Sequence, residues 1–403
     1  MHLLADASMP LVAQLAETFS DALHEQGIPF TLSTFHGRQP TPEQLASADL
    51  LMIRSITRVD AELLRHAPRL KWVGTATIGT EHVDADACRH AGVAFVSTPG
   101  VNANAVGDYV ASAISNIALE QGALPAGEVA IIGAGHTGRA AGQRLRGLGL
   151  NVHFYDPPLL QAGMHPTEVD VHADWQRVLA SKVISCHVPL TKNGEFPTYH
   201  LFSDKSIAAL TDDCILINAS RGAVVAEQAL RSAKQRNQRL HVVLDVWENE
   251  PQIAADLLPW LRYATAHIAG HSVAGKVGGT LRLFAELAGF LKQPDLALQL
   301  PSLRRLLKPW PEAVREYRWQ TDARPTWQML ASWVRDIYDI RIDDNLLRQA
   351  TPEPAAFDAL RRHYSARAEL SQGIVVGGRW LAQREWQNRL QQLTFSHIQK
   401  QEQ

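Results

Sequence analysis

Three ionisable residues lie in or just after apolar runs that predict buried strands. Arg221 follows CILIN, Glu250 follows HVVLDVW, and His267 lies in ATAHI. Ligands of parallel α/β sheets bind outside the carboxyl ends of the strands, so chemistry is expected at these positions. His267 can remove a hydroxyl proton, Glu250 can hold the imidazole tautomer, and Arg221 can bind a carboxylate in a bidentate fork. Together they predict a catalytic set for hydride transfer from an alcohol beside a carboxylate.

A glycine-rich segment predicts where the hydride acceptor binds. An apolar run at 129–132 leads into Gly133, Gly135 and Gly138, spaced as G-x-G-x-x-G, and a helical pattern covers 139–148. The first glycine permits the tight turn, the second lets the backbone approach a pyrophosphate, and the third lets the helix pack on the strand. The helix N-terminus then offers unpaired N–H groups to the phosphates. This segment therefore predicts a dinucleotide site.

The residue at the end of the next strand selects the dinucleotide. The apolar run 151–155 ends at Asp156. A carboxylate there accepts hydrogen bonds from both adenosine ribose hydroxyls and repels a 2′-phosphate. The expected cofactor is therefore NAD rather than NADP.

A metal centre is not expected. His267 and His271 are four residues apart, a spacing that suits zinc on a helix, but Gly270 lies between them and a strand precedes them. Taken singly, each catalytic candidate would more often be solvated or structurally paired. It is their joint position at successive strand ends that favours catalysis.

Composition bounds the classes of function. A chain of 403 residues suits two or three domains, and a net charge of −2 gives no electrostatic footprint for nucleic acid or an anionic membrane. Neither a signal peptide nor a run of about 18 apolar residues is found. Three widely spaced cysteines, Cys88, Cys186 and Cys214, suggest no disulfide framework. A cytoplasmic protein without nucleic-acid or membrane partners is expected.

The remaining pattern predicts two α/β domains and a C-terminal one. Before the glycine motif, strands are expected at 3–4, 30–35, 50–53, 72–73 and 93–96, with helices at 10–26, 42–48, 61–66 and 82–90. After a long helix at 104–121 and the motif, strands are expected at 182–188, 214–218, 241–246 and 264–268, with helices at 175–180, 204–210, 227–236 and 275–291. This predicts an α/β fold of two Rossmann-like, doubly wound parallel sheets plus a C-terminal α+β domain.

Three domains follow from these elements. Residues 1–103 with 270–292 are expected to form a discontinuous substrate-binding domain, 104–269 the NAD-binding domain, and 293–403 a C-terminal dimerisation domain. Six of the ten tryptophans lie in the last part, which also carries amphipathic patterns at 327–339 and 357–368. On composition alone, the tryptophans fit an interface or the core of a small domain equally well.

The motifs resemble one family. The order GAGHTG, Asp156, HVPLT, NASRGAVV, VVLDVWENEP and AHIAG is similar to that of the D-isomer-specific 2-hydroxyacid dehydrogenases, over residues 1 to about 290. The resemblance implies two Rossmann-like domains with the active site in the cleft. It also implies that Arg221 binds the substrate carboxylate, that Glu250 orients the histidine, and that His267 is the acid/base. These roles agree with those drawn from the residues.

Further segments resemble one branch of the family, namely LMIRSIT, GTATIGTEHVD, DIYDIRIDD and FDALRRHY. The resemblance implies a homodimer built by the C-terminal domain and a small phosphorylated 2-hydroxy acid as substrate. It places Ser55, Thr77 and His271 on the substrate, and on NAD it places Gly133, Gly135, His136, Thr137, Gly138, Asp156, Val188, Ala219, Asp245 and Gly270. The chain departs from the branch at Val188, where threonine is usual, at His271, where tyrosine is usual, and at Ala266, where proline is usual.

The substrate phosphate has several candidate ligands. Arg54 and Arg58 follow a strand of the small domain and Lys276 opens the returning helix, although a residue of this kind is more often a solvated surface charge. An arginine of a partner's C-terminal domain is a further alternative. Two other functions also remain open: another D-2-hydroxyacid dehydrogenase, acting on phosphoglycerate or on hydroxypyruvate and glyoxylate, or an NAD-sensing, corepressor-like binding protein.

Overall fold

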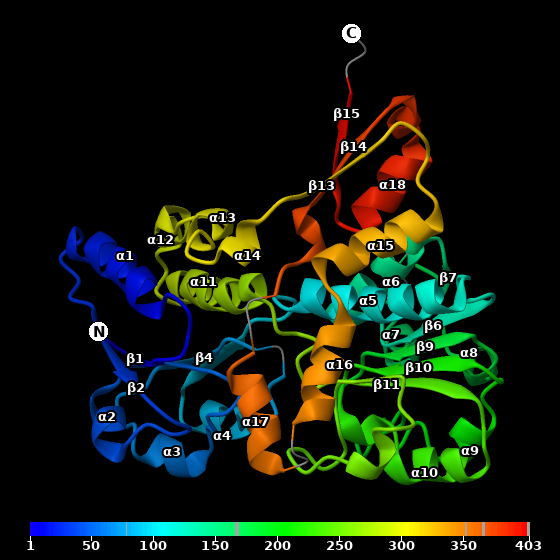
Figure 1. Ribbon diagram of the computed structural model, residues 1–403. Helices are drawn as coiled ribbons and strands as arrows, with labels where there is room; N and C mark the ends of the chain where they lie inside the picture. Colours follow the sequence, from blue (N-terminus) through cyan, green and yellow to red (C-terminus); the bar gives the residue numbers. More distant parts are fainter. Residues whose placement is uncertain (78, 165, 167–168, 351–352, 365–366, 401–403) are drawn as a thin grey trace. The chain divides into compact units, whose positions relative to one another are not determined.

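A computed structural model of the chain describes residues 1–77, 79–164, 166, 169–350, 353–364 and 367–400. The chain divides into two compact units (Figure 1). The first comprises Met1–Asn102 and Ser272–Val314, and the second Ala103–His271 and Arg315–Gln403. None of the helices within these described ranges has the length and apolar character needed to cross a membrane.

The first unit is built on a five-stranded parallel sheet with the order β2-β1-β3-β4-β5. Its strands are β1 (His2–Asp6), β2 (Thr31–Phe35), β3 (Leu50–Ile53), β4 (Trp72–Thr75) and β5 (Ala94–Ser97). Both β3 and β4 are buried along their whole length, as continuous apolar runs in a covered parallel sheet should be. The helices of this unit are α1 (Val12–His24), α2 (Pro42–Ser47), α3 (Ala61–Arg65), α4 (Ala85–His90), α11 (Val273–Phe290), α12 (Pro294–Gln299), α13 (Leu303–Leu306) and α14 (Pro311–Val314).

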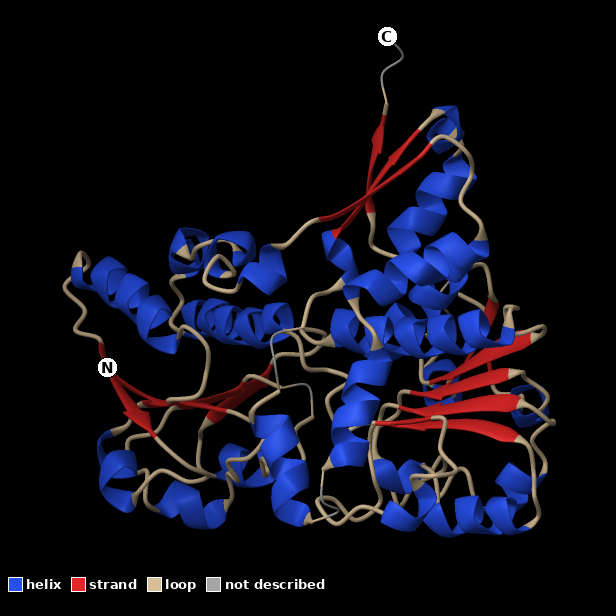
Figure 2. Cartoon of the chain, in the orientation of Figure 1, coloured by secondary structure: helices blue, strands red, loops and turns tan. Residues whose placement is uncertain are grey.

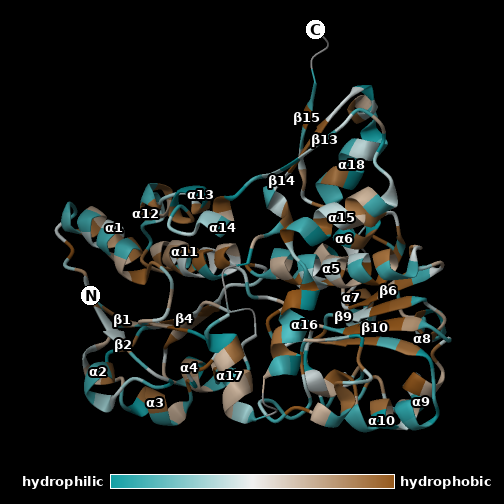
Figure 3. Ribbon diagram, viewed as in Figure 1, coloured by the Kyte–Doolittle hydropathy of each residue, from teal (hydrophilic) through white to brown (hydrophobic). Residues whose placement is uncertain are grey.

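The second unit contains a seven-stranded parallel sheet with the order β12-β11-β10-β9-β6-β7-β8. Its strands are β6 (Glu128–Ile132), β7 (Asn151–Tyr155), β8 (Val171–His172), β9 (Val183–Cys186), β10 (Cys214–Asn218), β11 (Leu240–Leu244) and β12 (Tyr263–Ala264). Its helices are α5 (Ala103–Gln121), α6 (His136–Leu148), α7 (Pro157–Gln161), α8 (Trp175–Leu179), α9 (Asp204–Ala208) and α10 (Glu227–Gln235). The hydropathy colouring marks central strands such as β6 and β10 as apolar (Figure 3).

The C-terminal segment 315–403 belongs to the same unit as the seven-stranded sheet. It adds a three-stranded parallel sheet of β13 (Tyr317–Thr321), β14 (Gly373–Gly377) and β15 (Ser396–Gln399), and Figure 2 draws all three sheets in red. Its helices are α15 (Trp327–Ile337), α16 (Ile340–Gln349), α17 (Pro354–Arg362) and α18 (Arg384–Gln392). Helix α15 packs on α5, and α18 packs on α6. The segment is therefore built onto one layer of helices of the Rossmann-like sheet.

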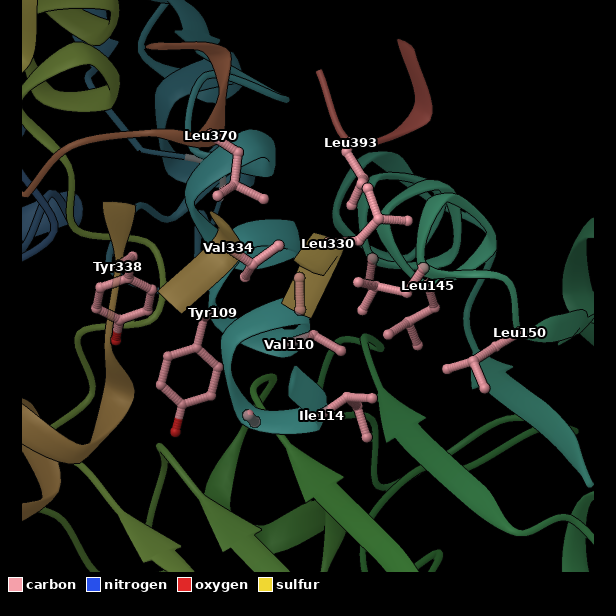
Figure 4. Close-up of a cluster of buried hydrophobic side chains, with 14 of the residues drawn as sticks. Tyr109, Val110, Ile114, Leu145, Leu150, Leu330, Val334, Tyr338, Leu370 and Leu393 are labelled. Atoms are coloured by element: carbon pink, nitrogen blue, oxygen red, sulfur yellow. The ribbon is translucent and has the colours of Figure 1, made fainter. Parts of the chain in front are cut away.

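Helices α5, α6 and α15 share one hydrophobic core, shown in Figure 4. Leu330 and Val334 of α15 belong to the same buried cluster as Val110 and Ile114 of α5 and Leu145 of α6. All five side chains are fully shielded from solvent. The C-terminal segment and the seven-stranded sheet are thus stabilised by the same buried surface.

The tryptophans of the C-terminal segment are part of this core. Trp333, Trp380 and Trp386 are only 5–7% exposed, and Trp319 stacks on Trp333 with ring centroids 5.2 Å apart. Of the two alternatives for the tryptophan content, a core within the chain accounts for these residues without a second subunit. Dimerisation stays a prediction.

The predicted fold class is confirmed: two Rossmann-like parallel sheets and a C-terminal part with its own sheet. The three expected domains differ from the two observed units. Residues 315–403 form one unit with the NAD-binding sheet and are not a separate unit, and residue 103 and residues 270–271 also belong to that second unit. Residues 293–314 lie with the first unit because α12 and α13 pack against α11. The assignment of substrate binding to the first unit and of dimerisation to the last segment remains a prediction.

Candidate active site

The predicted site residues of the second unit lie along the carboxyl edge of its sheet. The sheet grows from β6 through β7 to β8 on one side, and the later strands β9 to β12 continue on the other side of β6. Doubly wound sheets bind their ligands at the point between the two halves, here between β6 and β9. Reading across the sheet from β7 to β12, the strand ends lead to Asp156 (β7), Gly133, Gly135, His136, Thr137 and Gly138 (β6), Val188 (β9), Ala219 and Arg221 (β10), Asp245 and Glu250 (β11), and His267 and Gly270 (β12). The structure therefore brings the cofactor residues and the catalytic candidates to one edge, in a row.

His267 and Glu250 form a hydrogen-bonded pair. Nδ1 of His267 lies 2.7 Å from Oε2 of Glu250, and the two side chains are 32% and 18% exposed. The other carboxylate oxygen, Oε1, accepts a hydrogen bond of 2.9 Å from the backbone N–H of Trp247. Because an ionised carboxylate only accepts, the pairing places the ring proton of neutral His267 on Nδ1 and leaves Nε2 as the base.

The pKa of Glu250 is lower than that of an ordinary glutamate. Burial alone would raise this pKa, but the hydrogen bond and charge of His267, the Trp247 N–H and the nearby Arg361 guanidinium together outweigh the burial. Glu250 is therefore ionised at neutral pH. It can stabilise a positive charge that forms on His267 during proton transfer.

A buried aspartate holds the loop that carries His267. His267 has a φ of 54°, in the left-handed region that residues other than glycine rarely adopt. Asp245 is 1% exposed, and its carboxylate accepts hydrogen bonds from Ile268 N at 2.7 Å and Ala269 N at 2.9 Å. Thr265 Oγ1 donates to the same carboxylate at 2.6 Å. The family resemblance implies that Asp245 contacts NAD, whereas the contacts described for its side chain all fix the loop that carries His267.

The turn that carries Arg221 is fixed by Asn218. The amide Nδ2 of Asn218 donates to the carbonyl of Arg221 at 2.9 Å. At Gly222 an added Cβ would collide with the carbonyl of Trp247, so the ends of β10 and β11 pack directly on one another. Arg221 is half-buried, and its Nη1 donates to the carbonyl of Ser220 at 2.9 Å. A charged fork is thus held at the strand end next to the one that leads to Glu250.

The glycine turn fits a dinucleotide. Gly133 has a φ of 94°, and an added Cβ at Gly138 would run into the carbonyl of Gly133, so both positions need glycine for the fold itself. Gly135, the N-cap of α6, is exposed, and an added Cβ there would meet nothing within 4 Å. The protein leaves this space open at the helix N-terminus, where a pyrophosphate would approach.

Asp156 has both structural partners and remaining capacity. Its Oδ2 accepts from Ala134 N at 2.8 Å and its Oδ1 accepts from Leu159 N at 3.1 Å, which caps α7. A carboxylate has about four acceptor sites, so two ribose hydroxyls can still bind. The residues present therefore fit NAD.

Two of the positions that depart from the family branch have apolar or aromatic surroundings. Val188 is half-buried, and its Cγ1 lies 3.0 Å from where a Cβ of Gly133 would stand. The ring of His271 packs edge-on against Tyr364, with centroids 5.8 Å apart. The hydroxyl that the branch has at residue 188 is therefore absent here, and the ring at residue 271 is accompanied by a tyrosine from the C-terminal segment.

The substrate-side candidates belong to the first unit. Arg54 and Ser55 directly follow β3, and Thr77 comes two residues after β4, the neighbouring strand. Nε of Arg54 donates to the buried Asp6 at 2.8 Å, and Thr77 Oγ1 donates to the carbonyl of Gly79 at 3.0 Å. Ser55 is exposed. The structure thus brings these three residues to the carboxyl edge of the first sheet.

A set of contacts from the C-terminal segment was not expected from the sequence. Nη1 of Arg361 lies 3.9 Å from Oε2 of Glu250. Asp344 Oδ1 accepts a hydrogen bond of 2.7 Å from Ala264 N, and Arg367 Nη2 donates to the carbonyl of Ala269 at 2.8 Å. No local spacing signals these contacts, because each joins residues 80 or more positions apart. Asp344 and Arg361 lie in DIYDIRIDD and FDALRRHY, which were distinguished only by their resemblance to one branch of the family.

Within the ranges that the structure describes, no group of three or more His, Cys, Asp or Glu side chains is placed to hold a metal ion. The three cysteines are buried free thiols.

Comparisons with known sequences agree with this geometry. Residues 110–272 match the family model described as D-isomer specific 2-hydroxyacid dehydrogenase, NAD binding domain, and residues 311–393 match one described only as a domain of unknown function. The chain is 44% identical to the erythronate-4-phosphate dehydrogenase of Idiomarina loihiensis, over 93% of this chain and 94% of that protein. It is 38% identical to the enzyme of that name from Shewanella halifaxensis, over 99% of this chain and all of that protein.

Solved structures share the fold at lower identity. A 3-phosphoglycerate dehydrogenase of Entamoeba histolytica with bound NAD+ matches with a TM-score of 0.59 and 19% identity, over 75% of this chain and 99% of that one. A D-lactate dehydrogenase of Aquifex aeolicus complexed with NAD and lactic acid matches with a TM-score of 0.55 and 21% identity, over 75% of this chain and 100% of that one. These likenesses establish the fold.

Proposed function

The chain belongs to the erythronate-4-phosphate dehydrogenase family, within the NAD-dependent D-isomer-specific 2-hydroxyacid dehydrogenases, and we propose that it oxidises 4-phospho-D-erythronate. The product is 2-oxo-3-hydroxy-4-phosphobutanoate. The observation that carries this proposal is the His267–Glu250 pair, 2.7 Å apart, in line with Arg221 and the glycine turn along one sheet edge. Similarity to the named relatives over nearly the whole chain supports the choice of substrate.

Each catalytic residue has one role in this reaction. His267 takes the proton of the carbon-2 hydroxyl on Nε2 as the hydride leaves that carbon, and Glu250 stabilises the resulting imidazolium through Nδ1. Arg221 binds the substrate carboxylate and polarises the developing carbonyl. NAD, when bound, accepts the hydride. The alcohol thus loses a proton and a hydride and becomes a ketone.

Binding roles are assigned on the same basis. NAD is held by Gly133, Gly135, His136, Thr137, Gly138, Asp156, Val188, Ala219, Asp245 and Gly270. Ser55, Thr77 and His271 contact the substrate, and Arg54 is the ligand proposed for its phosphate. Support comes from the family motifs and from the position of each residue at the carboxyl edge of a sheet.

We also propose the cellular setting. The reaction belongs to pyridoxal 5′-phosphate (vitamin B6) biosynthesis in the cytoplasm, where the three thiols stay reduced. The enzyme acts as a homodimer assembled through the C-terminal segment. Ile342 and Leu346, one turn apart on α16, are 62% and 45% exposed and offer an apolar surface for such an interface. Sedimentation velocity of the purified chain tests the dimer.

The His267→Asn variant tests the proposed chemistry. Asparagine keeps a polar side chain but cannot take the proton, so turnover of 4-phospho-D-erythronate should fall by at least about 100-fold. NAD binding, followed by titration of protein fluorescence, should stay within about threefold, because the glycine turn is unchanged. Normal turnover by this variant would show that the base has been wrongly assigned.

A further inference from the structure

Arg367 is a buried cation close to the proposed catalytic loop. Its side chain is 6% exposed, and Nη2 donates hydrogen bonds to the carbonyl of Ala105 at 2.7 Å and to the carbonyl of Ala269 at 2.8 Å. The guanidinium carbon also lies 4.1 Å from the ring centroid of Tyr338. One side chain from the C-terminal segment therefore connects the start of α5 with the loop that carries His267.

The two carbonyls occupy special places in the chain. The chain passes between its two compact units after Asn102 and after His271. Ala105 comes shortly after the first passage and Ala269 shortly before the second. Within the second unit, Arg367 thus fixes the spacing between the two segments of chain that continue into the first unit.

A second layer supports this arrangement. The hydroxyls of Tyr338 and Tyr364 both donate to Oδ2 of Asp343 at 2.8 Å. Asp343 is buried, and one of these two hydroxyls belongs to Tyr338, on whose ring Arg367 rests. Tyr364 in turn contacts the ring of His271. The aromatic and acidic residues around Arg367 thus reach the same loop from its other end.

The energetics favour a role beyond packing. Burying a guanidinium costs several kcal/mol unless its hydrogen bonds and neighbours compensate, and an apolar side chain of similar volume often stabilises a fold as well or better. A guanidinium adds directional hydrogen bonds, because the carbonyl oxygens of Ala105 and Ala269 must both point at its Nη2. The loop it holds includes His267, whose φ of 54° needs support from its surroundings.

We propose that Arg367 is a positioning residue for the dehydrogenase reaction, which sets the His267 loop through the carbonyl of Ala269. This inference rests on the proposed role of His267 as the base. A displacement of the base by about 1 Å can cost on the order of 100-fold in rate, so loss of this anchor should affect the chemical step more than cofactor binding.

Arg389 provides a matched control. It also comes from the C-terminal segment, donates to the carbonyls of Gly147 at 3.2 Å and Leu148 at 3.0 Å, and lies 4.6 Å from the ring centroid of Trp386. Its partners are at the carboxyl end of α6, away from the His267 loop. Loss of Arg389 should therefore weaken docking of the segment in a similar way without moving the base.

The test compares the full-length variants Arg367→Met and Arg389→Met. We expect Arg367→Met to lower kcat at least about tenfold and to raise the kinetic isotope effect of substrate deuterated at carbon 2, since hydride transfer becomes more rate-limiting. Arg389→Met should keep kcat within about twofold. Both variants should lose comparable thermal stability and keep NAD affinity. If Arg367→Met does not fold, Arg367→Lys and Arg389→Lys give the same comparison.

Two outcomes would overturn the inference. Equal kcat in the Arg367 and Arg389 variants would show that Arg367 only docks the segment. A lower kcat with an unchanged isotope effect would show that it acts on a step other than hydride transfer. His267→Asn, measured in the same series, separates this inference from the proposed function: if that variant is inactive while Arg367→Met is normal, only the role of Arg367 is wrong.

Discussion

In the proposed reaction, the carboxylate of Glu250 acts on His267 in two ways. It fixes the proton on Nδ1, so that Nε2 is available as the base, and it stabilises the imidazolium that forms. Its lowered pKa keeps it ionised throughout the neutral range. The pair contributes to stability above the ordinary pKa of glutamate, and this contribution is lost as pH falls through the lowered pKa. Protonation of Glu250 therefore does not change the stability of the protein above the ordinary pKa of glutamate.

Glu250→Gln should lower the rate of the chemical step. The amide keeps the size of the side chain but loses the charge that stabilises the imidazolium, so kcat should drop at least about tenfold. Steady-state kinetics of 4-phospho-D-erythronate oxidation measure this effect.

A neighbouring pair supplies the control for this variant. Glu248 lies in the loop after β11, like Glu250, and its Oε1 is 2.6 Å from Nε2 of His200. It is therefore also a carboxylate paired with a histidine. Glu248→Gln should keep kcat within about twofold. An equal loss of kcat in both variants would contradict a specific role of Glu250.

In the turn between β6 and α6, the fold requires glycine at residues 133 and 138 but not at residue 135. Gly135 has a φ of −73° and open space at its Cβ, so Gly135→Ala should change the free energy of unfolding by less than about 0.5 kcal/mol. The added methyl group would occupy the approach to the helix N-terminus. We expect NAD affinity to fall about tenfold, or 1.4 kcal/mol.

Gly138→Ala tests the other half of this distinction. Its Cβ would collide with the carbonyl of Gly133, so the apo protein should lose about 1–3 kcal/mol of stability. Calorimetry of NAD binding and chemical unfolding of both variants measure the two effects. Gly135→Ala with unaltered NAD affinity would mean that the pyrophosphate does not lie over this turn.

The elements also show what a sequence can predict. The β6–α6–β7 unit was predicted because its apolar runs, glycines and Asp156 are all local signals, and the structure confirms both strands, with α6 starting three residues earlier than expected. The strand expected at 264–268 is only Tyr263–Ala264. Asp245 binds the N–H groups of Ile268 and Ala269 and so removes them from the ladder of strand hydrogen bonds.

One helix of the C-terminal segment was missed because its buried face is partly polar. Helix α16 was not predicted, since its buried positions include Asp343 and Asp344, which break the apolar period. The helix expected at 357–368 spans Pro354–Arg362, where the proline at its first turn sets the start.

For the site, the local pattern identified Arg221, Glu250 and His267 as candidates. Arg361 and Arg367 reach the loop only through tertiary packing.

For the whole molecule, the shared core means that the C-terminal segment and the NAD-binding layer should unfold together. Leu330 is fully buried in the cluster that includes Val110 and Leu145. Leu330→Ala should therefore lower the free energy of unfolding by about 2–5 kcal/mol, in a transition that NAD shifts as it does in the wild type. Leu298→Ala, at an 83% exposed position of α12, should change it by less than about 0.5 kcal/mol. A separate, NAD-insensitive transition in Leu330→Ala would contradict the shared core.

The most direct test of the account is substrate preference. Initial rates of NADH formation should be measured with 4-phospho-D-erythronate, D-erythronate, 3-phosphoglycerate and glycolate, with a 2-oxo acid present to reoxidise any retained cofactor. We expect kcat/KM for 4-phospho-D-erythronate to exceed that for each of the others by at least about 100-fold, since losing a charged anchor costs several kcal/mol. Equal or greater activity with 3-phosphoglycerate or glycolate would contradict the proposed substrate. NADH-dependent binding of a partner protein without turnover of any of these substrates would instead favour a corepressor-like function.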